Sequence, residues 1–462
     1  MLRLRAAKRS RTAIAKLTAI ALGLGFAVVG LGPSQARAGG PETLTGTFAD
    51  GATYLIQVPA DWNGTLVLYS HGYVTPGSAN PATDVGDPVT GQWLLDNGYA
   101  LAGSSYATTG WAVQQAIPDQ LETLNTFDSL VGKPHRTIAW GHSLGGMITA
   151  GLIQVAPDLF TAALPMCGVV AGGVQTWNLA LDSALAVQQL LGPTSGLQIV
   201  NITDPTDNLT LSEELFAAAQ TTPQGQARIA LASALGDIPG WFDPSSPEPA
   251  PTDYAAQEAN QDLWETEIDG PFAFDLRAEL EARAGGNPSW TGGVDFWQQL
   301  QESPDYNEVK ALYHAAGLSL SADVATLNAA PRITPDPSAV AYLKHYIVFN
   351  GDISQPVLTL HTTGDGLVVN EDEAQYKLTV DAAGKGSLLR QVFVSRAGHC
   401  TFTPAETIAA FKALIHRVNT GHWGNLSPGA LNAVASALGP AYNTMPAAYV
   451  RFTPLRFQRP AN

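Results

Sequence analysis

Cysteine and charge are both scarce in this sequence. Its 462 residues include only two cysteines, which excludes a small fold held together by several disulfides. Charged residues make up 14% of the chain and hydrophobic ones 45%, a composition too apolar for an intrinsically disordered protein. The length allows two or three domains, or one large core with additions.

Outside the start of the chain, acidic residues greatly outnumber basic ones. Residues 1–38 contain seven Lys or Arg and no acid, so the remainder has 17 basic and 40 acidic residues, a net charge of −23. Binding to nucleic acid or to an anionic membrane surface requires clustered Lys and Arg. We therefore expect no nucleic-acid partner, and polyanionic substrates are disfavoured.

The first 38 residues are typical of an export signal. A basic start is followed by an apolar run from Leu17 to Leu31, and small residues at Ala36 and Ala38 fit a cleavage site. The alternative is a membrane anchor, which requires about 20 apolar residues. This run is shorter and contains three glycines. We expect cleavage after Ala38 and a protein secreted outside the cell or into the periplasm, with no stable membrane anchor.

Strand-like and helix-like segments alternate in two parts of the chain, which predicts an α/β fold with a parallel sheet covered by helices on both faces. These parts, residues 39–170 and 355–423, form the predicted core. Residues 171–354 predict a largely helical insertion, and residues 424–462 a tail packed on the core. The expected strands are residues 43–48, 54–58, 65–70, 99–104, 137–140, 162–166, 357–361 and 390–394, and the expected helices include 91–97, 117–131, 211–219, 276–284, 371–383 and 405–418.

One short motif indicates chemistry. Gly141-His142-Ser143-Leu144-Gly145 matches G-x-S-x-G and lies between a strand-like segment and a helix-compatible one. At such a sharp turn both glycines are needed, because a Cβ there would collide with the neighbouring strand and helix. The helix N-terminus also brings a positive dipole end near the serine. The alternative is a glycine-rich helix start with an ordinary capping serine.

With this motif the chain resembles the α/β-hydrolase superfamily, in which the serine is followed along the chain by an acid and then a histidine. Asp365 follows the strand-like segment 357–361, and His399 follows the segment 390–394, at the places of the acid and the base. The resemblance implies an α/β-hydrolase fold, a Ser143-His399-Asp365 triad and a lid formed by the helical insertion. Glu371 and Asp372 are the nearest rivals for the acid, but they lie at a predicted helix start, where an acid ordinarily caps the helix.

The resemblance also implies an oxyanion hole. Ser70-His71-Gly72-Tyr73 follows the segment 65–70 and is similar to the His-Gly-x motif of the superfamily. The backbone N–H groups of Tyr73 and Leu144 are then the expected donors to the oxyanion of the tetrahedral intermediate. The alternative for His71-Gly72 is an ordinary turn.

The two cysteines are expected to form a disulfide. Cys167 ends the strand-like segment 162–166 and Cys400 adjoins His399, so both belong at the carboxyl edge of the sheet, and a cysteine pair in an exported protein should be oxidised. We predict no metal or cofactor, because the sequence has no HExxH, paired CxxC, EF-hand, GxGxxG or P-loop motif. The spacing of the acidic residues does not call for calcium.

These observations support three hypotheses. The first is a secreted, carboxylesterase-like serine hydrolase acting on a small or polymeric ester of low charge through an acyl-enzyme. The second is an exported, aminopeptidase-like exopeptidase that uses acids of the lid to bind a substrate amino terminus. The third is a binding module without activity, and the presence of a candidate for every catalytic role argues against it. The sequence specifies neither the substrate nor the oligomeric state.

Overall fold

A nine-stranded sheet forms the centre of the protein, in a computed structural model that describes residues 40–459. The predicted export signal lies outside these residues. The strand order is β1-β2-β4-β3-β5-β6-β7-β8-β9, in which β3 to β8 run parallel and β1, β2 and β9 pair antiparallel with their neighbours. The strands are β1 Glu42–Thr47, β2 Thr53–Val58, β3 Thr65–Ser70, β4 Ala100–Ser104, β5 Arg136–His142, β6 Ala162–Met166, β7 Val357–Gly364, β8 Leu389–Ala397 and β9 Tyr449–Val450.

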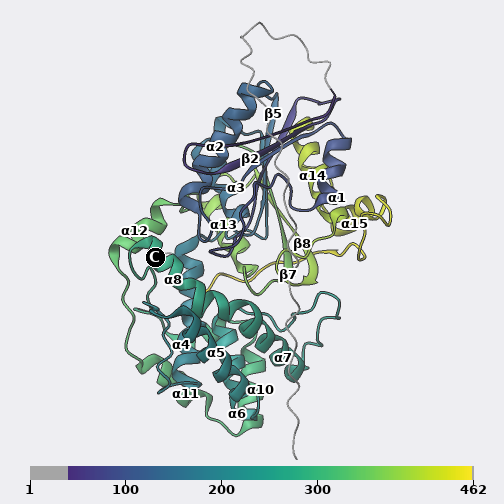
Figure 1. Cartoon of the computed structure of the whole chain (residues 1–462). Helices are drawn as coiled ribbons and strands as arrows, with labels where there is room; N and C mark the ends of the chain where they lie inside the picture. The colour runs from purple at the N-terminus through teal and green to yellow at the C-terminus, as the bar shows by residue number, and fades with distance from the viewer. Residues whose placement is uncertain (1–39, 460–462) are drawn as a thin grey trace, which may run out of the picture. The chain divides into compact units, whose positions relative to one another are not determined.

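Helices cover both faces of this sheet (Figure 1). One hydrophobic cluster joins the sheet to α2, α3 and α13, and another joins it to α1, α14 and α15. Every residue of β3 and β6 is buried, as expected for strands covered on both faces. The predicted α/β-hydrolase fold is therefore confirmed. These helices are α1 Pro88–Asp96, α2 Val113–Leu130, α3 Leu144–Val155, α13 Glu371–Ala382, α14 Pro404–Thr420 and α15 Pro428–Ser436.

Between β6 and β7 the chain forms helices joined by loops, and it lies below the sheet in the view of Figure 1. A hydrophobic core of its own, with Phe216, Leu231 and Phe296 fully buried, holds these helices together. Two π-helical segments, η2 and η3, interrupt the α-helices. The elements are α4 Gly173–Leu190, α5 Pro205–Ala219, α6 Pro223–Leu235, α7 Tyr254–Trp264, η2 Glu265–Asp269, η3 Phe272–Leu276, α8 Arg277–Ala284, α9 Phe296–Glu302, α10 Tyr306–Ala316, α11 Leu320–Ala329 and α12 Pro337–His345.

The C-terminal segment contacts both the sheet and the inserted helices. Its strand β9 pairs with β8, and the residues that follow have no regular secondary structure. Phe457 is buried against Ala171 and Leu179, and the guanidinium of Arg459 donates to Oδ1 of Asp182 over 2.6 Å. The segment therefore links the core to α4 of the insertion.

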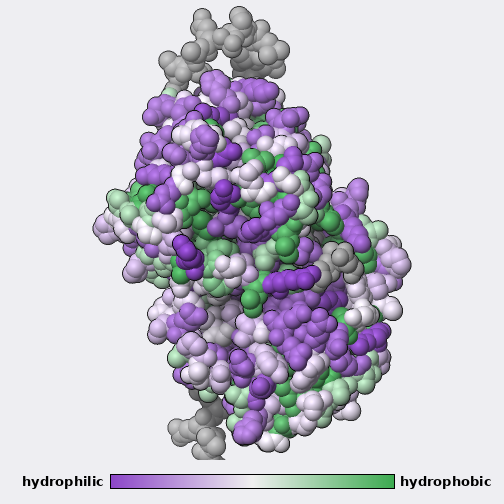
Figure 2. Space-filling view, turned by 180° about the vertical axis from the view of Figure 1, so that it is seen from behind, coloured by the Kyte–Doolittle hydropathy of each residue, from purple (hydrophilic) through white to green (hydrophobic). Residues whose placement is uncertain are grey.

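None of the helices in residues 40–459 combines the length and the hydrophobicity that crossing a bilayer requires. Figure 2 shows hydrophilic side chains over much of one face, with hydrophobic ones interspersed. The large hydrophobic side chains that are exposed, such as Val89, Leu130 and Leu378, belong to different elements.

Candidate active site

Ser143 occupies a strained turn between β5 and α3. Its φ is 58° and its ψ is −126°, a conformation that residues other than glycine rarely adopt. A Cβ on Gly145 would lie 1.9 Å from the carbonyl oxygen of Ser70, and one on Gly141 would lie 2.3 Å from that of Gly145. The turn therefore requires both glycines, for the steric reason that the motif implies, and it leaves Ser143 half-buried at the start of a helix.

Asp365 and His399 are hydrogen-bonded to each other. Nδ1 of His399 lies 2.8 Å from Oδ2 of Asp365, whose Oδ1 accepts the N–H groups of Leu367 and Val368. Burial alone would raise the pKa of Asp365, but His399 and His361 hold it below its ordinary value. An ionised carboxylate can only accept, so Nδ1 carries the proton and Nε2 of the neutral ring is left as the base.

Ser143 and His399 lie at the same edge of the sheet. The N–H of Ser143 donates to the carbonyl oxygen of Met166 over 3.0 Å, and the next residue, Cys167, is bonded to Cys400 beside His399. Within residues 40–459 no hydrogen bond joins the Ser143 hydroxyl to His399, and Nε2 contacts the Cys400 sulfur at 3.4 Å. Catalytic hydrogen bonds are often long before the substrate binds and tighten in its complex.

The predicted disulfide is present. Cys167 and Cys400 are bonded, with their Cα atoms 5.4 Å apart, and both have a positive φ. Their sulfurs and a ring nitrogen of His399 lie within 4.8 Å of one another, a spacing that could suit a metal. Metal ligation requires thiolates, and the disulfide leaves none at this place.

The backbone of Tyr73 and Leu144 lies next to Ser143. Leu144 is the first residue of α3, so its N–H has no acceptor within the helix. A Cβ on Gly72 would lie 3.3 Å from that of Ser143, which brings the turn before Tyr73 against the serine. His71 steadies this turn, because its ring stacks on Tyr106 with centroids 4.0 Å apart.

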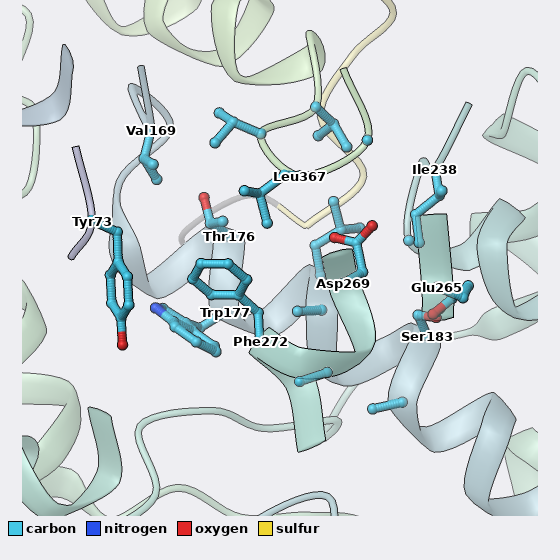
Figure 3. A pocket seen from close by; sticks show the side chains of 18 of the residues that line it. Tyr73, Val169, Thr176, Trp177, Ser183, Ile238, Glu265, Asp269, Phe272 and Leu367 are labelled. Carbon is cyan, nitrogen blue, oxygen red and sulfur yellow. The ribbon is translucent and has the colours of Figure 1, made fainter. Parts of the chain in front are cut away.

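A cavity opens beside these residues (Figure 3). Tyr73 and Leu144 line it, together with Leu367 from the loop that carries Asp365. The π-helical segments of the insertion form part of the wall, and such segments are frequent at functional sites. Further lining residues from the insertion are Trp177, Ile238, Glu265, Asp269, Phe272 and Phe274.

Two carboxyl groups lie in this mostly apolar cavity. Burial raises the pKa of Glu265 to about 7, and Oε1 of this residue accepts a hydrogen bond from Ser183 over 2.8 Å. Burial, together with the charges of Glu265 and Asp365, raises the pKa of Asp269 well above its ordinary value. Oδ2 of Asp269 has no hydrogen-bond partner in the described part of the chain. This shift favours the protonated form of Asp269, in which a carboxyl can donate a hydrogen bond.

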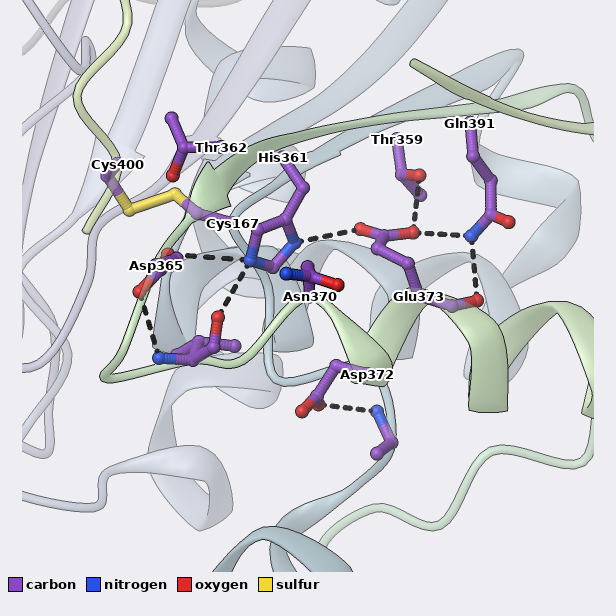
Figure 4. A network of polar contacts seen from close by, with 12 residues as sticks. Cys167, Thr359, His361, Thr362, Asp365, Asn370, Asp372, Glu373, Gln391 and Cys400 are labelled. Carbon is purple, nitrogen blue, oxygen red and sulfur yellow. Dashed lines mark hydrogen bonds and ion pairs between the residues drawn. A yellow bond between two sulfur atoms is a disulfide. The ribbon is translucent and has the colours of Figure 1, made fainter. Parts of the chain in front are cut away.

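His361 is a site residue that the sequence analysis missed. It is fully buried in β7, with Nε2 3.4 Å from Oδ2 of Asp365 and Nδ1 3.2 Å from Oε1 of Glu373 (Figure 4). Burial alone would lower the pKa of His361, but the two carboxylates raise it well above its ordinary value. The available signal was a histidine at the last position of the expected strand 357–361.

The rival acid Asp372 has a different role from the one expected. It does not cap α13, since its Oδ1 accepts the backbone N–H of Ala171 over 2.8 Å. The expectation of a capping role is wrong for this residue, because the start of the insertion supplies a donor that the sequence pattern does not reveal. Asp372 anchors that start to the core, and Glu371 lies in a second cavity described below.

Comparisons with known proteins gave one relative of high coverage. An o-phthalyl amidase from Xanthobacter agilis is 30% identical over 429 residues, which span 85% of this chain and 90% of that protein. Among solved structures, an esterase from Aspergillus oryzae is similar over 82% of this chain and 80% of its own, with 14% identity and a TM-score of 0.40. An acylaminoacyl peptidase from Pyrococcus horikoshii is similar over 85% of this chain and 43% of its own, with 10% identity and a TM-score of 0.39.

No family model matches the chain. The amidase nevertheless shows the family, since its identity to this chain extends over most of both sequences. The strand order and the helices on both faces of the sheet give the fold independently. The chain belongs to the family of the o-phthalyl amidase of Xanthobacter agilis, and it is a hydrolase of the α/β-hydrolase type.

Proposed function

We propose that this protein is a serine hydrolase that cleaves carboxylic esters through an acyl-enzyme. Ser143 attacks the carbonyl carbon, His399 accepts its proton and later returns it to the leaving group, and Asp365 orients the imidazole. The observation that carries the proposal is the hydrogen bond between His399 Nδ1 and Asp365 Oδ2, which fixes the tautomer in which Nε2 is the base. Water then attacks the acyl-enzyme and releases the acid.

The charge that develops on the carbonyl oxygen needs preorganised donors. We assign this role to the N–H groups of Tyr73 and Leu144, whose residues line the cavity beside Ser143. Losing one such donor typically costs about 3 to 4 kcal/mol of transition-state stabilisation. The position of Leu144 at the start of α3 adds the positive end of the helix dipole.

The cavity favours an uncharged acyl group with an apolar or aromatic body. Trp177, Phe272 and Leu367 supply apolar surface, and no Lys or Arg of the described residues lines it. An anionic acyl group would meet the carboxyls of Glu265 and Asp269. In this proposal the insertion acts as the lid that selects the substrate.

Export is part of the proposal. The basic and apolar start of the chain supports it, and the disulfide between Cys167 and Cys400 suits an oxidising compartment. The mature protein would then begin at Gly39.

Amide hydrolysis is the second candidate, and the 30% identical relative favours it, because its name states that it is an amidase acting on an o-phthalyl group. The same triad, oxyanion hole and acyl-enzyme serve both bonds. The predicted exopeptidase activity is a special case, in which Glu265 or Asp269 would bind the substrate amino terminus.

A substrate panel tests these alternatives. Purified protein beginning at Gly39 is assayed with p-nitrophenyl esters, N-aroyl anilides and aminoacyl anilides, and the Ser143→Ala variant is assayed beside it. We expect ester turnover that Ser143→Ala abolishes, and fluorophosphonate labelling of the wild type alone. Faster turnover of the anilides than of the esters would show that the protein is an amidase instead of an esterase. Equal labelling or turnover in the serine variant would refute the mechanism.

A further inference from the structure

Three side chains with unused oxygen atoms line a second cavity, of about 380 Å³, which we call the acidic cavity. They are Asp237, Asn370 and Glu371, whose exposed fractions are 5%, 7% and 5%. Oδ2 of Asp237, Oδ1 of Asn370 and Oε2 of Glu371 have no hydrogen-bond partner among the described residues. Buried oxygen atoms without partners cost free energy, so they indicate a ligand, water or ion.

In Asp237 and Asn370, the other terminal atom of the carboxylate or amide group makes a hydrogen bond, and this fixes which oxygen remains unused. Gln458 donates to Oδ1 of Asp237, and the amide nitrogen of Asn370 donates to the carbonyl oxygen of Thr363 over 3.1 Å. Asp305, another carboxylate of the acidic cavity, accepts from Gln261 over 3.3 Å. The unused oxygens of Asp237 and Asn370 are therefore held in place by the hydrogen bonds of their neighbouring atoms.

The carboxylates of the acidic cavity lack a counter-charge. Within residues 40–459 no Lys or Arg pairs with Asp237, Asp305 or Glu371, and Arg459 nearby is paired with Asp182. Buried carboxylates cost free energy as charged groups unless they are paired or bind a cation. Either protons or a bound cation must neutralise this group.

We propose that the acidic cavity binds a calcium ion through the carboxylates of Asp237 and Glu371 and the amide oxygen of Asn370. Calcium takes six to eight oxygen ligands in flexible geometry and accepts carboxylate, amide and water oxygens together. The cavity has room for waters to complete the shell. Because the ligands come from separate elements, no loop motif marks the site in the sequence.

The ion joins the insertion to the core. Asp237 follows α6 of the insertion, whereas Asn370 and Glu371 begin α13 of the core. Thr363 and Gly364, which also line the acidic cavity, directly precede Asp365. Calcium therefore stabilises the contact between insertion and core beside the loop of the proposed catalytic acid.

Calcium binding and thermal unfolding test this proposal without any turnover measurement, so the result is separate from that of the proposed hydrolysis. The EDTA-treated protein should bind one Ca²⁺ per chain in isothermal titration calorimetry, with a Kd on the order of 10⁻⁴ M, and its Tm should rise with Ca²⁺ concentration. Asp237→Asn and Glu371→Gln should each weaken binding at least about tenfold. The matched control is Asp372→Asn, a buried carboxyl of the same helix turn that does not line the acidic cavity, and it should keep the Ca²⁺ response.

Terbium gives a direct optical readout of the same site. Trp241 lines the acidic cavity, so excitation of tryptophan should sensitise bound Tb³⁺, and Ca²⁺ should displace the emission. Trp241→Phe should dim this emission while the Ca²⁺-dependent rise in Tm remains. Absence of any Ca²⁺ effect on the folded wild type would overturn the proposal and assign neutralisation to protons. Undiminished Ca²⁺ binding by both Asp237→Asn and Glu371→Gln would overturn it as well.

Discussion

His399 and Asp365 follow adjacent parallel strands, β8 and β7, and meet through a 2.8 Å hydrogen bond between Nδ1 and Oδ2. Asp365→Asn would present an amide there, and the imidazole would lose the acceptor that fixes its tautomer. We expect kcat to fall about 10⁴-fold with little change in KM, as in serine hydrolases that lose this acceptor. Steady-state kinetics with the best ester of the panel provide the measurement. Asp372→Asn is the control, and an equal loss in that variant would contradict the assignment.

His361 should act as a positioning residue for Asp365. Its pKa is raised in the folded protein, so its stabilising contribution is complete below the ordinary value of 6.5 and is lost as pH rises through the raised value. The wild type should therefore exceed His361→Gln in free energy of unfolding most at about pH 6 and progressively less at alkaline pH. Urea unfolding between pH 6 and pH 10 measures this difference. A pH-independent difference would show that His361 is not charged.

The same variant also separates positioning from binding. Without His361, the Asp365 carboxylate loses a charged neighbour 3.4 Å away. We expect kcat to fall about 10- to 100-fold, with KM nearly unchanged, because a misplaced catalytic group slows the reaction without weakening binding. A rise in KM with an unaltered kcat would assign His361 to substrate binding instead.

Gly145 cannot carry a side chain. Gly145→Ala would place a Cβ 1.9 Å from the carbonyl oxygen of Ser70. That oxygen belongs to the backbone, so it cannot move aside as a flexible side chain could. We expect Gly145→Ala to lose activity and to show a large fall in Tm. Gly429→Ala is the control, because a Cβ at that position meets nothing within 4 Å and a helix such as α15 favours alanine over glycine. A Tm of Gly145→Ala equal to that of Gly429→Ala would mean that the turn is more adaptable than described.

The disulfide should stabilise the fold. Replacing Cys167 and Cys400 together by serine should lower the free energy of unfolding by about 2 to 5 kcal/mol. Thermal unfolding with and without dithiothreitol tests whether the loss of the disulfide causes this change. The reductant should lower the Tm of the wild type and leave that of the double variant unchanged. If full reduction left the Tm of the wild type unchanged, the disulfide would not contribute to thermal stability.

Phe272 should limit the size of the acyl group. It lines the cavity and packs edge-on against Tyr73, with ring centroids 5.1 Å apart. Phe272→Ala should therefore raise kcat/KM for long-chain p-nitrophenyl esters relative to the acetate. Phe452→Ala, which alters a different cavity, should leave the ratio unchanged. A ratio unaffected in both variants would show that acyl groups bind elsewhere.

Much of the fold could be predicted because its strands are short apolar runs that end at glycines and polar turns. Residues 65–70 and 162–166 match β3 and β6 residue for residue. Helix α2 begins at Val113 rather than at residue 117, so Pro118 lies inside the helix and not in its first turn. Strand β9 has two residues and depends on its pairing with β8, so no local sequence pattern predicts it.

Asp365 and His399 were chosen through the resemblance to the α/β-hydrolase superfamily, and the structure places them after the adjacent parallel strands β7 and β8. The contact between His361 and Glu373 could not be predicted, because it joins a strand to a helix and depends on their packing. The π-helical segments that carry Asp269 and Phe272 could not be predicted either, because tertiary packing sets their backbone and no periodic sequence pattern marks them.

Cys167 precedes the insertion and Cys400 lies beyond it, 233 positions along the chain. A protease that cuts once anywhere between them produces two fragments that remain one covalent molecule. Such nicked protein would migrate as a single band on a denaturing gel until a reductant separates the pieces. Damage within the inserted helices thus leaves both halves of the sheet attached to each other.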